Sequence, residues 1–131
     1  MENRVIKFRA WDGDKIIYQS EDGWFDKVKH PEYQSPQCMK FASVMRVCKI
    51  MQFTGLTDKN GVDGYEKDFV MESRVGLPNE LIGIVKYDTD LCAFIVEKTN
   101  GGVEYLGKHM TDNPRNVFFG NIYENPELLN P

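Results

Sequence analysis

The chain has 131 residues, a formal net charge of −4, 41% hydrophobic residues and 27% charged residues, which is ordinary for a globular protein. A chain of this length buries about two-thirds of the surface that its unfolded form exposes, so it can build a core without disulfides or structural metals. No apolar run approaches the roughly 18 residues of a membrane span, and residues Met1 to Phe8 contain no apolar signal region. We therefore expect a cytoplasmic protein.

The charge is unevenly distributed along the chain. Residues 1–50 carry nine Lys and Arg against seven Asp and Glu, whereas residues 51–131 carry seven against thirteen. An excess of two positive charges is far below that of a typical nucleic-acid-binding domain, so the charge balance by itself favours acidic, well-solvated turns over a basic binding surface.

The first predicted element is a β-hairpin. Residues 4–11 alternate with period two, which is typical of a half-buried strand. One side carries Ile6, Phe8 and Ala10, and the opposite side carries Lys7, Arg9 and Trp11. A polar turn over residues 12–15 leads to a return strand that begins at Ile16.

Two segments before the middle of the chain are harder to assign. Residues 29–37 contain two prolines and no periodicity, which predicts a long loop. Residues 44–54 alternate imperfectly, and their β-branched content favours a strand. The alternative is a helix with Val44, Val47, Cys48 and Met51 on one stripe.

The second half of the chain predicts short strands separated by turns. Asn60-Gly61 predicts a type I′ turn, and a strand follows over residues 65–71. A further hairpin joins residues 81–87 to residues 92–97, and two more strands are expected over residues 103–106 and 117–123. Residues 107–116 are polar with a turn at Asn113-Pro114, and Asn125-Pro126 predicts a short helical start.

This spacing, with a strand about every dozen residues, is typical of small barrels and sandwiches. We therefore predict a mainly β fold with a small barrel-like core, SH3-like or similar, over residues 51–131. The N-terminal region, residues 1–50, adds the β-hairpin and the long loop.

Cysteine and histidine give little indication of a metal or cofactor site. The three cysteines, Cys38, Cys48 and Cys92, have no Cys-x-x-Cys spacing, and we expect Cys48 and Cys92 to be small buried hydrophobic residues. His30 and His109 are far apart in the sequence, with no acidic residue at ligand spacing. We predict no cofactor, no metal site and no catalytic residues.

The acidic residues of the central stretch could form a weak divalent-cation site, since four carboxylates lie within eleven residues: Asp58, Asp63, Glu66 and Asp68. Ordinary turn chemistry explains the same residues, together with the neighbouring glycines, and is the favoured interpretation.

Two binding surfaces can be proposed in the N-terminal region. Lys7, Arg9 and Trp11 share one side of the first strand, and such a row can contact phosphates and stack on bases. Large aromatic residues also concentrate there, which favours a protein interface. The candidate residues for that interface are Trp11, Trp24, Phe25 and Tyr33.

Three segments of the sequence carry a family resemblance: residues 6–12 (IKFRAWD), residues 51–70, which contain MQFTGLTDKNG and YEKDFV, and residues 120–129 (GNIYENPELL). Together they resemble the YopX family of bacteriophage and prophage proteins. Two positions depart from the family pattern: Lys67 stands where a glycine is usual, and Phe69 where a smaller aliphatic residue is common.

The resemblance implies a phage or prophage origin and a bacterial cytoplasm, but it carries over no catalytic or binding residues. We predict a non-enzymatic accessory protein that acts through protein–protein binding, forms homo-oligomers and has a phage or host protein as partner. The alternative is a small β-barrel protein that binds nucleic acid.

Overall fold

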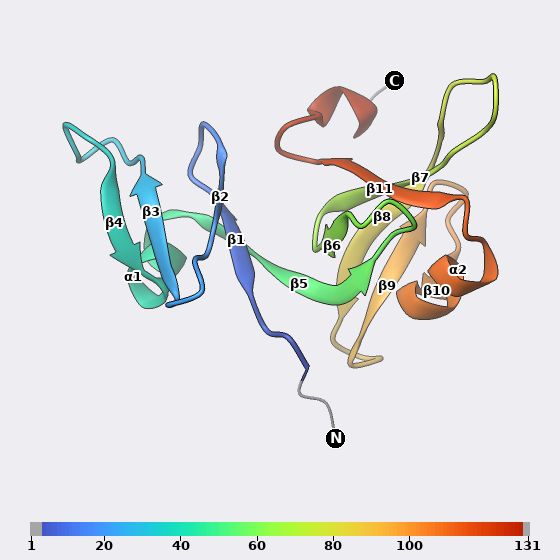
Figure 1. Cartoon of the computed structure of the whole chain (residues 1–131), viewed down its shortest axis with the longest axis horizontal. Helices are drawn as coiled ribbons and strands as arrows, with labels where there is room; N and C mark the ends of the chain where they lie inside the picture. Colours follow the sequence, from blue (N-terminus) through green and yellow to red (C-terminus); the bar gives the residue numbers. More distant parts are fainter. Residues whose placement is uncertain (1–3, 130–131) are drawn as a thin grey trace. The chain divides into compact units, whose positions relative to one another are not determined.

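The computed structural model describes residues 4–129, and their secondary structure is mainly β, in three antiparallel sheets (Figure 1). The chain divides into two compact units, Met1–Phe53 (unit 1) and Thr54–Pro131 (unit 2), which are described separately. The sequence interpretation placed this division between residues 50 and 51. Within residues 4–129, no helix is long and apolar enough to cross a membrane.

Unit 1 contains a sheet, a two-stranded ribbon and one short helix. Its elements are β1 (Phe8–Trp11), β2 (Ile16–Tyr18), β3 (Trp24–Val28), β4 (Gln37–Lys40), α1 (Phe41–Val47) and the first part of β5 (Lys49–Thr57). β1 pairs with β2 on one side and with β5 on the other, and β3 pairs with β4 as a separate ribbon. The predicted first hairpin is confirmed, with Ala10 opposite Ile17.

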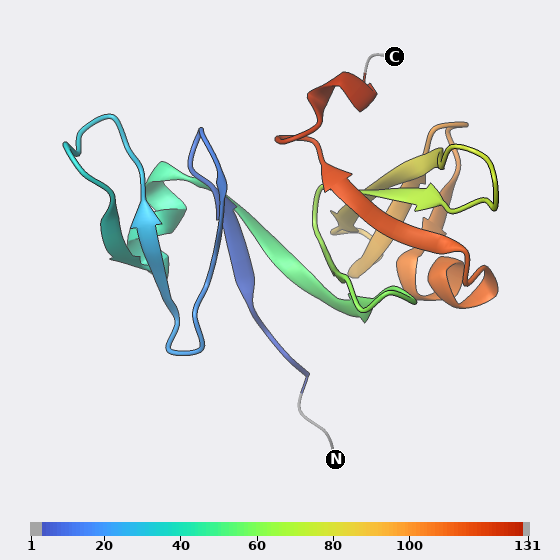
Figure 2. The same ribbon diagram turned by 45° about the horizontal axis from the view of Figure 1, so that its top comes forward.

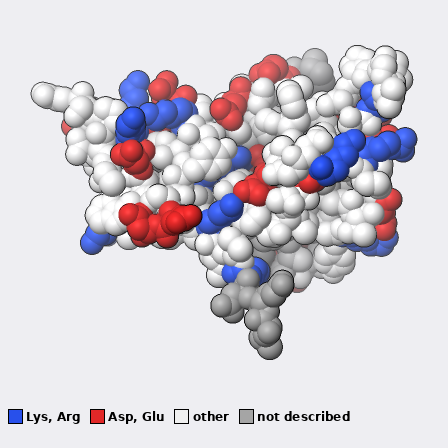
Figure 3. All heavy atoms as spheres, in the orientation of Figure 1, with Lys and Arg blue, Asp and Glu red and all other residues white. Residues whose placement is uncertain are grey.

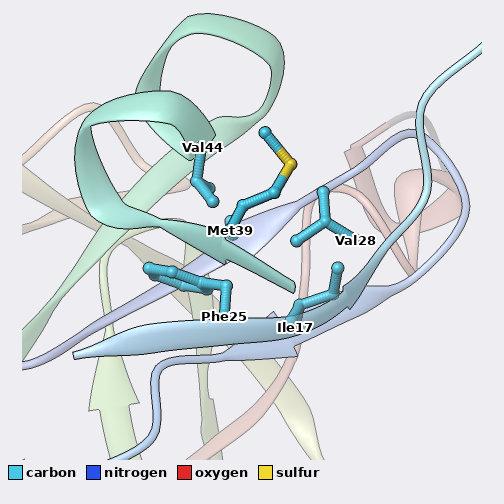
Figure 4. Packing of buried hydrophobic residues seen from close by; sticks show 6 residues of the cluster. Ile17, Phe25, Val28, Met39 and Val44 are labelled. Atoms are coloured by element: carbon cyan, nitrogen blue, oxygen red, sulfur yellow. The ribbon is translucent and has the colours of Figure 1, made fainter. Parts of the chain in front are cut away.

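The core of unit 1 gathers apolar side chains from the hairpin, the ribbon and α1. Figure 4 shows five of them pointing toward one another: Ile17, Phe25, Val28, Met39 and Val44. All five are buried, and Phe25, Val28 and Val44 have no exposed surface. Burial of these side chains holds the ribbon and the helix against the hairpin.

The strand predicted over residues 44–54 is only partly correct. Residues up to Val47 belong to α1, and the strand begins at Lys49. Val44 and Val47 lie three residues apart on one helix face and both contact the core, so burial outweighs the β propensity of valine.

Unit 2 is built around a five-stranded antiparallel sheet in the order β10-β9-β8-β7-β11. Its elements are β6 (Asp63–Tyr65), β7 (Asp68–Glu72), β8 (Glu80–Asp88), β9 (Ala93–Lys98), β10 (Val103–Tyr105), α2 (Leu106–Asp112), β11 (Asn116–Asn121) and the 3₁₀ helix η1 (Pro126–Leu129). The predicted hairpin of residues 81–87 and 92–97 is confirmed, with Val85 opposite Val96.

The five-stranded sheet curls into a half-barrel, as Figure 2 shows. The strand content and the curvature therefore agree with the predicted barrel-like core. The sheet forms only a half-barrel, and β10 and β11 are its two edge strands. The remaining short strand, β6, pairs with β5, which runs on from the sheet of unit 1.

Apolar clusters cover both faces of the five-stranded sheet. One contains Val70, Val85, Val96, Leu106 and Phe118, and the other contains Phe69, Met71 and Val117 with Leu81, Ile84, Ile122 and Leu128 around them. Phe69 and Val70 are neighbours in the chain and fully buried on opposite faces. The large side chain at position 69 is therefore accommodated inside the second cluster.

The helix α2 was missed from the sequence, where residues 107–116 read as a polar segment. Leu106 is the residue of α2 that is fully buried, and it joins the first cluster of the sheet. A helix of seven residues with one buried anchor shows too little periodicity to be recognised. The short helical start at Pro126 is confirmed as η1.

The turn at Asn60-Gly61 differs from the predicted type I′ turn. Gly61 has a φ of +79°, but Asn60 is not among the residues with positive φ. The Gly61 N–H donates to the Asp58 carbonyl (3.0 Å), and the Asp58 N–H donates to the Val62 carbonyl (3.0 Å). This pattern is a type I turn followed by a left-handed glycine, in a three-residue hairpin loop.

Lys67 keeps the left-handed conformation that a glycine would allow, with a φ of +72°. Its N–H donates to the Val85 carbonyl (2.8 Å), and its carbonyl accepts from the Ile122 N–H (3.1 Å). Hydrogen bonds to two different segments therefore hold a conformation that is unfavourable for lysine.

Candidate functional site

The central acidic stretch is a structural turn. Asp58 is buried, and its Oδ1 accepts hydrogen bonds from the N–H groups of Asn60 (2.8 Å) and Val62 (3.0 Å). Its Oδ2 accepts from the Phe118 N–H (3.0 Å), 60 residues further along the chain. This carboxylate therefore fixes the turn and ties it to β11.

Asp68 has a comparable structural role. It is 3% exposed, and its Oδ2 accepts a hydrogen bond from the Tyr65 N–H (2.8 Å), which closes the turn between β6 and β7. Within the described part of the chain, no group of three or more His, Cys, Asp or Glu residues is arranged to hold a metal ion. Turn chemistry therefore accounts for this stretch.

The predicted basic and aromatic row of β1 is not an exposed stripe. Arg9 is only 4% exposed, although the alternation placed it on the solvent side of a half-buried strand. β1 is a central strand between β2 and β5, and Met51, opposite Arg9, is also fully buried. Lys7 places its Nζ 4.5 Å from the centroid of the Phe53 ring, and Trp11 is half-buried.

Two neighbouring residues of β3, Trp24 and Phe25, lie on opposite faces of the strand, one exposed and one in the core. Phe25 is fully buried in the core of unit 1 and so is not available as a binding residue. Trp24, on the other side of the strand, is 37% exposed. It lies opposite Lys40 of β4, whose Nζ is 5.4 Å from the centroid of the indole ring, a cation–π contact.

We name this outward side of the ribbon the ribbon face, defined by Trp24, Cys38 and Lys40. Cys38 and Lys40 are exposed and alternate along β4 with the buried Met39. β4 lies at the edge of its two-stranded sheet, with β3 as its one strand partner in the described part of the chain. An edge strand beside an exposed aromatic residue is a surface on which another chain can bind.

Tyr33 lies apart in the sequence, in the loop between β3 and β4, where it is 36% exposed. Its ring centroid is 5.5 Å from that of His30. Together with the turn after β1, this loop lines a groove of about 340 Å³: Asp12, Gly13, Asp14, Lys29, His30, Pro31 and Tyr33.

Asp12 anchors this loop to the first hairpin. Its Oδ1 accepts from the N–H groups of Asp14 and Lys15 (both 2.9 Å), and its Oδ2 accepts from the Lys29 N–H (3.0 Å). Burial by itself would raise the pKa of Asp12, but these three backbone donors together lower it below its usual value. The carboxylate therefore stabilises the loop in its ionised form.

The remaining cysteines differ in their surroundings. Cys48 is half-buried beside the core of unit 1, as predicted for a small hydrophobic residue, and burial raises the pKa of its thiol. Cys92 was predicted to be buried as well, but it is exposed, with a φ of +52° at the end of the turn between β8 and β9. That turn, rather than the strand, determines its environment.

Sequence reasoning found Trp24 and missed Lys40. The lysine becomes part of the surface only through the pairing of β3 with β4. Residues 37–40 (QCMK) show no clear alternation of polar and apolar residues, and four residues are too few to assign a strand partner.

Comparison with known proteins places the chain in a family. None of the curated proteins matches the chain. The crystal structure of protein EF1440 from Enterococcus faecalis is similar, with a TM-score of 0.56 and 20% identity, over 97% of this chain and 99% of that one. At this identity the similarity shows the fold alone. The model of the YopX protein family matches residues 7–130, so the chain belongs to the YopX family.

Proposed function

We propose that this protein is a non-enzymatic, phage- or prophage-encoded accessory protein that acts inside the bacterial host by binding another protein through the ribbon face. The observation that supports this proposal best is Trp24, a large aromatic ring that stays 37% exposed on a strand whose next residue is fully buried. Tryptophan is among the residues most enriched at binding hot spots.

The residues around Trp24 hold its side chain on the exposed face of the ribbon. Phe25 and Met39 lie opposite each other and anchor both strands of the ribbon in the core, so the side chains on the other side point outward. The cation–π contact with Lys40 favours one orientation of the indole ring. A preorganised aromatic residue loses less conformational entropy when a partner covers it.

Nucleic-acid binding, the alternative, has weaker support. Small β-barrels often bind oligonucleotides, and an SH3-like barrel is the finer interpretation of the curled sheet. However, Arg9 is buried, so the proposed phosphate contact loses its central residue. On the face shown in Figure 3, basic and acidic side chains are mixed. A continuous basic surface would favour phosphate contacts more.

The test is affinity purification of the tagged full-length protein from phage-infected cells, analysed for both protein and nucleic acid. We expect a specific phage or host protein with the wild type, and its loss with Trp24→Ala. Phe119→Ala is the matched control, because Phe119 is an exposed aromatic residue of unit 2 (50% exposed).

Two results would contradict the proposal. One is recovery of the same proteins with Trp24→Ala as with the wild type. The other is recovery of nucleic acid alone, released by salt, which would support the alternative.

A further inference from the structure

The loop between β7 and β8 displays two apolar side chains at its tip. Val75 has a relative exposure of 103%, the highest of the large hydrophobic residues in the described part of the chain, and Leu77 is 59% exposed. We name these two residues the apolar tip. Neither packs on its own chain to a degree that explains an apolar residue there, so the tip is a surface suited to a partner.

The loop is held in one conformation by its own contacts. The Leu77 N–H donates to the Arg74 carbonyl (3.4 Å), and Gly76 between them has a φ of +72°, as the third position of a type II turn requires. The Arg74 side chain donates to the Pro78 carbonyl (3.1 Å) and lies 3.9 Å from the Glu80 carboxylate. The contacts of the Arg74 side chain therefore hold the two ends of the loop together beneath Val75 and Leu77.

The same unit carries a groove with an apolar floor. We name it the sheet groove; its volume is about 410 Å³, and it is lined by Phe69, Leu81, Gly83, Ile84, Glu97, Lys98, Thr99, Leu128 and Leu129. Leu81 and Ile84 of β8, both half-buried, form part of the floor, whereas Phe69 of β7, opposite Ile84, has no exposed surface. Leu128 and Leu129 of η1 line another side, and Leu129 is 46% exposed.

The charged residues of the groove are engaged with their own chain. The Lys86 Nζ lies 3.0 Å from Glu97 Oε1, and the Lys98 Nζ lies 2.7 Å from Glu104 Oε2. Glu97 and Lys98, the charged residues that line the groove, therefore each have an ion-pair partner in their own chain, and most of the other lining residues are apolar. An apolar side chain is therefore the occupant that fits its chemistry.

The apolar tip and the sheet groove are neighbours in the fold. Glu80 contacts Arg74 of the tip loop, and the next residue, Leu81, already lines the groove. A protruding element next to a complementary recess is the arrangement that a two-fold axis can pair with itself, since each copy then supplies both parts.

We propose that two copies of this chain associate about a two-fold axis, with the apolar tip of each copy inserted into the sheet groove of the other. The proposal goes beyond the proposed function: it gives a contact for the homo-oligomer expected from the sequence and uses a surface other than the ribbon face. Each tip contributes only two side chains, so the two reciprocal contacts have to act together and the dimer is expected to be reversible.

The test measures the mass of the full-length protein by sedimentation equilibrium from about 1 μM to about 1 mM, a range that covers weak interfaces. We expect a monomer–dimer equilibrium for the wild type. Val75→Ser/Leu77→Ser removes the tip, and Leu129→Asp places a charge in the wall of the groove. Each is expected to raise the dissociation constant at least about tenfold.

Matched controls separate these effects from general loss of surface hydrophobicity. Val62→Ser changes another exposed valine (45%), and Leu91→Asp changes a leucine of nearly the same exposure (47%) as Leu129. Neither residue lines the groove or belongs to the tip, so both controls are expected to dimerise as the wild type does. Thermal unfolding of every variant checks that the exposed changes leave the fold intact.

Mixing the two defective variants gives the decisive result. The tip variant keeps its groove, and the groove variant keeps its tip, so a mixed dimer retains one of the two contacts. We expect the mixture to form more dimer than either variant alone. The proposal is overturned if the wild type stays monomeric up to about 1 mM, if either defective variant dimerises like the wild type, or if mixing restores nothing.

The result is distinguishable from a failure of the proposed function. Trp24→Ala is expected to lose its phage or host partner and keep the dimer, whereas Val75→Ser/Leu77→Ser is expected to keep the partner and lose the dimer. Failure of one expectation leaves the other standing.

Discussion

The two units use their apolar residues differently, and the difference explains where binding surfaces arise. In the ribbon of unit 1, one face packs on the core and the other is exposed, so Phe25 is buried and Trp24 is exposed. In β7 of unit 2, Phe69, Val70 and Met71 are all buried because clusters cover both faces of the sheet. A strand that is covered on one face exposes the side chains of its other face to a partner. A sheet that is covered on both faces exposes apolar side chains mainly in its loops and at its edges.

The largest difference in stability is expected between substitutions of two neighbouring residues of β3, Phe25 and Trp24. Phe25→Ala should lower the free energy of unfolding by about 3–5 kcal/mol, because it leaves a cavity in the core of unit 1. Trp24→Ala should cost less than about 1 kcal/mol, as is usual for surface substitutions. Denaturant unfolding followed by tryptophan fluorescence reports on unit 1 in both variants, because both tryptophans lie in that unit and Trp24→Ala keeps Trp11. Equal losses would show that the alternation does not separate core from surface.

The next effect concerns the turn that ties Asp58 to β11. Asp58→Ala should cost about 3 kcal/mol, because it leaves three backbone N–H groups without their acceptor, including that of the buried Phe118. Asp88→Ala is the matched control. Asp88 accepts the two N–H groups of its own turn, those of Asp90 and Leu91.

We expect Asp88→Ala to cost about 1 kcal/mol, since its bonds are exposed. The difference between the two variants in denaturant unfolding measures the bond that closes unit 2 over a long sequence separation. If both variants lose the same stability, the contact between Asp58 and β11 contributes nothing.

A smaller loss of stability is expected where Gly64 lies close to the ring of Phe118 in unit 2. A Cβ atom at Gly64 would overlap the ring of Phe118, whereas one at Gly107 in α2 would meet nothing within 4 Å. Gly64→Ala should therefore cost about 1–3 kcal/mol through overpacking. Gly107→Ala should stabilise by up to about 1 kcal/mol, because alanine favours the helix. Calorimetric melting temperatures that move in the same direction would contradict this pair.

A modest gain in stability is expected at Lys67. Lys67→Gly should raise the free energy of unfolding by about 0.5–1 kcal/mol, because glycine adopts the left-handed conformation without the steric cost that lysine carries there. Lys59→Gly, in a turn position without positive φ, should instead lower stability by up to about 1 kcal/mol. Thermal unfolding compares the two, and a loss of stability in Lys67→Gly would be inconsistent with strain at this position.

The smallest effect is a change in pH dependence. The native pKa of Asp12 lies below its unfolded value of 3.8, so its contribution to stability is complete above that pH and is lost as the pH falls through the native pKa. Asp12→Asn should flatten the acid limb of the stability curve of unit 1, followed by tryptophan fluorescence. An unchanged slope below pH 4 would contradict a native role for the ionised carboxylate.

Sequence reasoning was most successful where local chemistry decides the structure. It found the two hairpins, the helical start at Pro126 and the family, all of which depend on turn residues and short alternating runs. It was wrong about the burial of Arg9 and Cys92 and about the first residues of the segment 44–54. Each of these depends on which elements lie alongside, a property that no local pattern contains.

The candidate site was predicted in part. Trp24 and Tyr33 are on the surface as expected, whereas Phe25 belongs to the core and Arg9 is buried. Lys40 entered the site only through the register of the ribbon. Val75 and Leu77 fall between the strands predicted over residues 65–71 and 81–87, but their exposure required the structure.

The amino-acid sequence by itself determined the mainly β class, the positions of most turns and the family, because periodicity and turn chemistry act between residues close in the chain. The tertiary structure decided which face of each strand is covered, the left-handed conformation of Lys67, and the long-range bond from Asp58 to β11. These features depend on contacts between segments that are distant in the sequence, where burial and hydrogen bonding outweigh local preference.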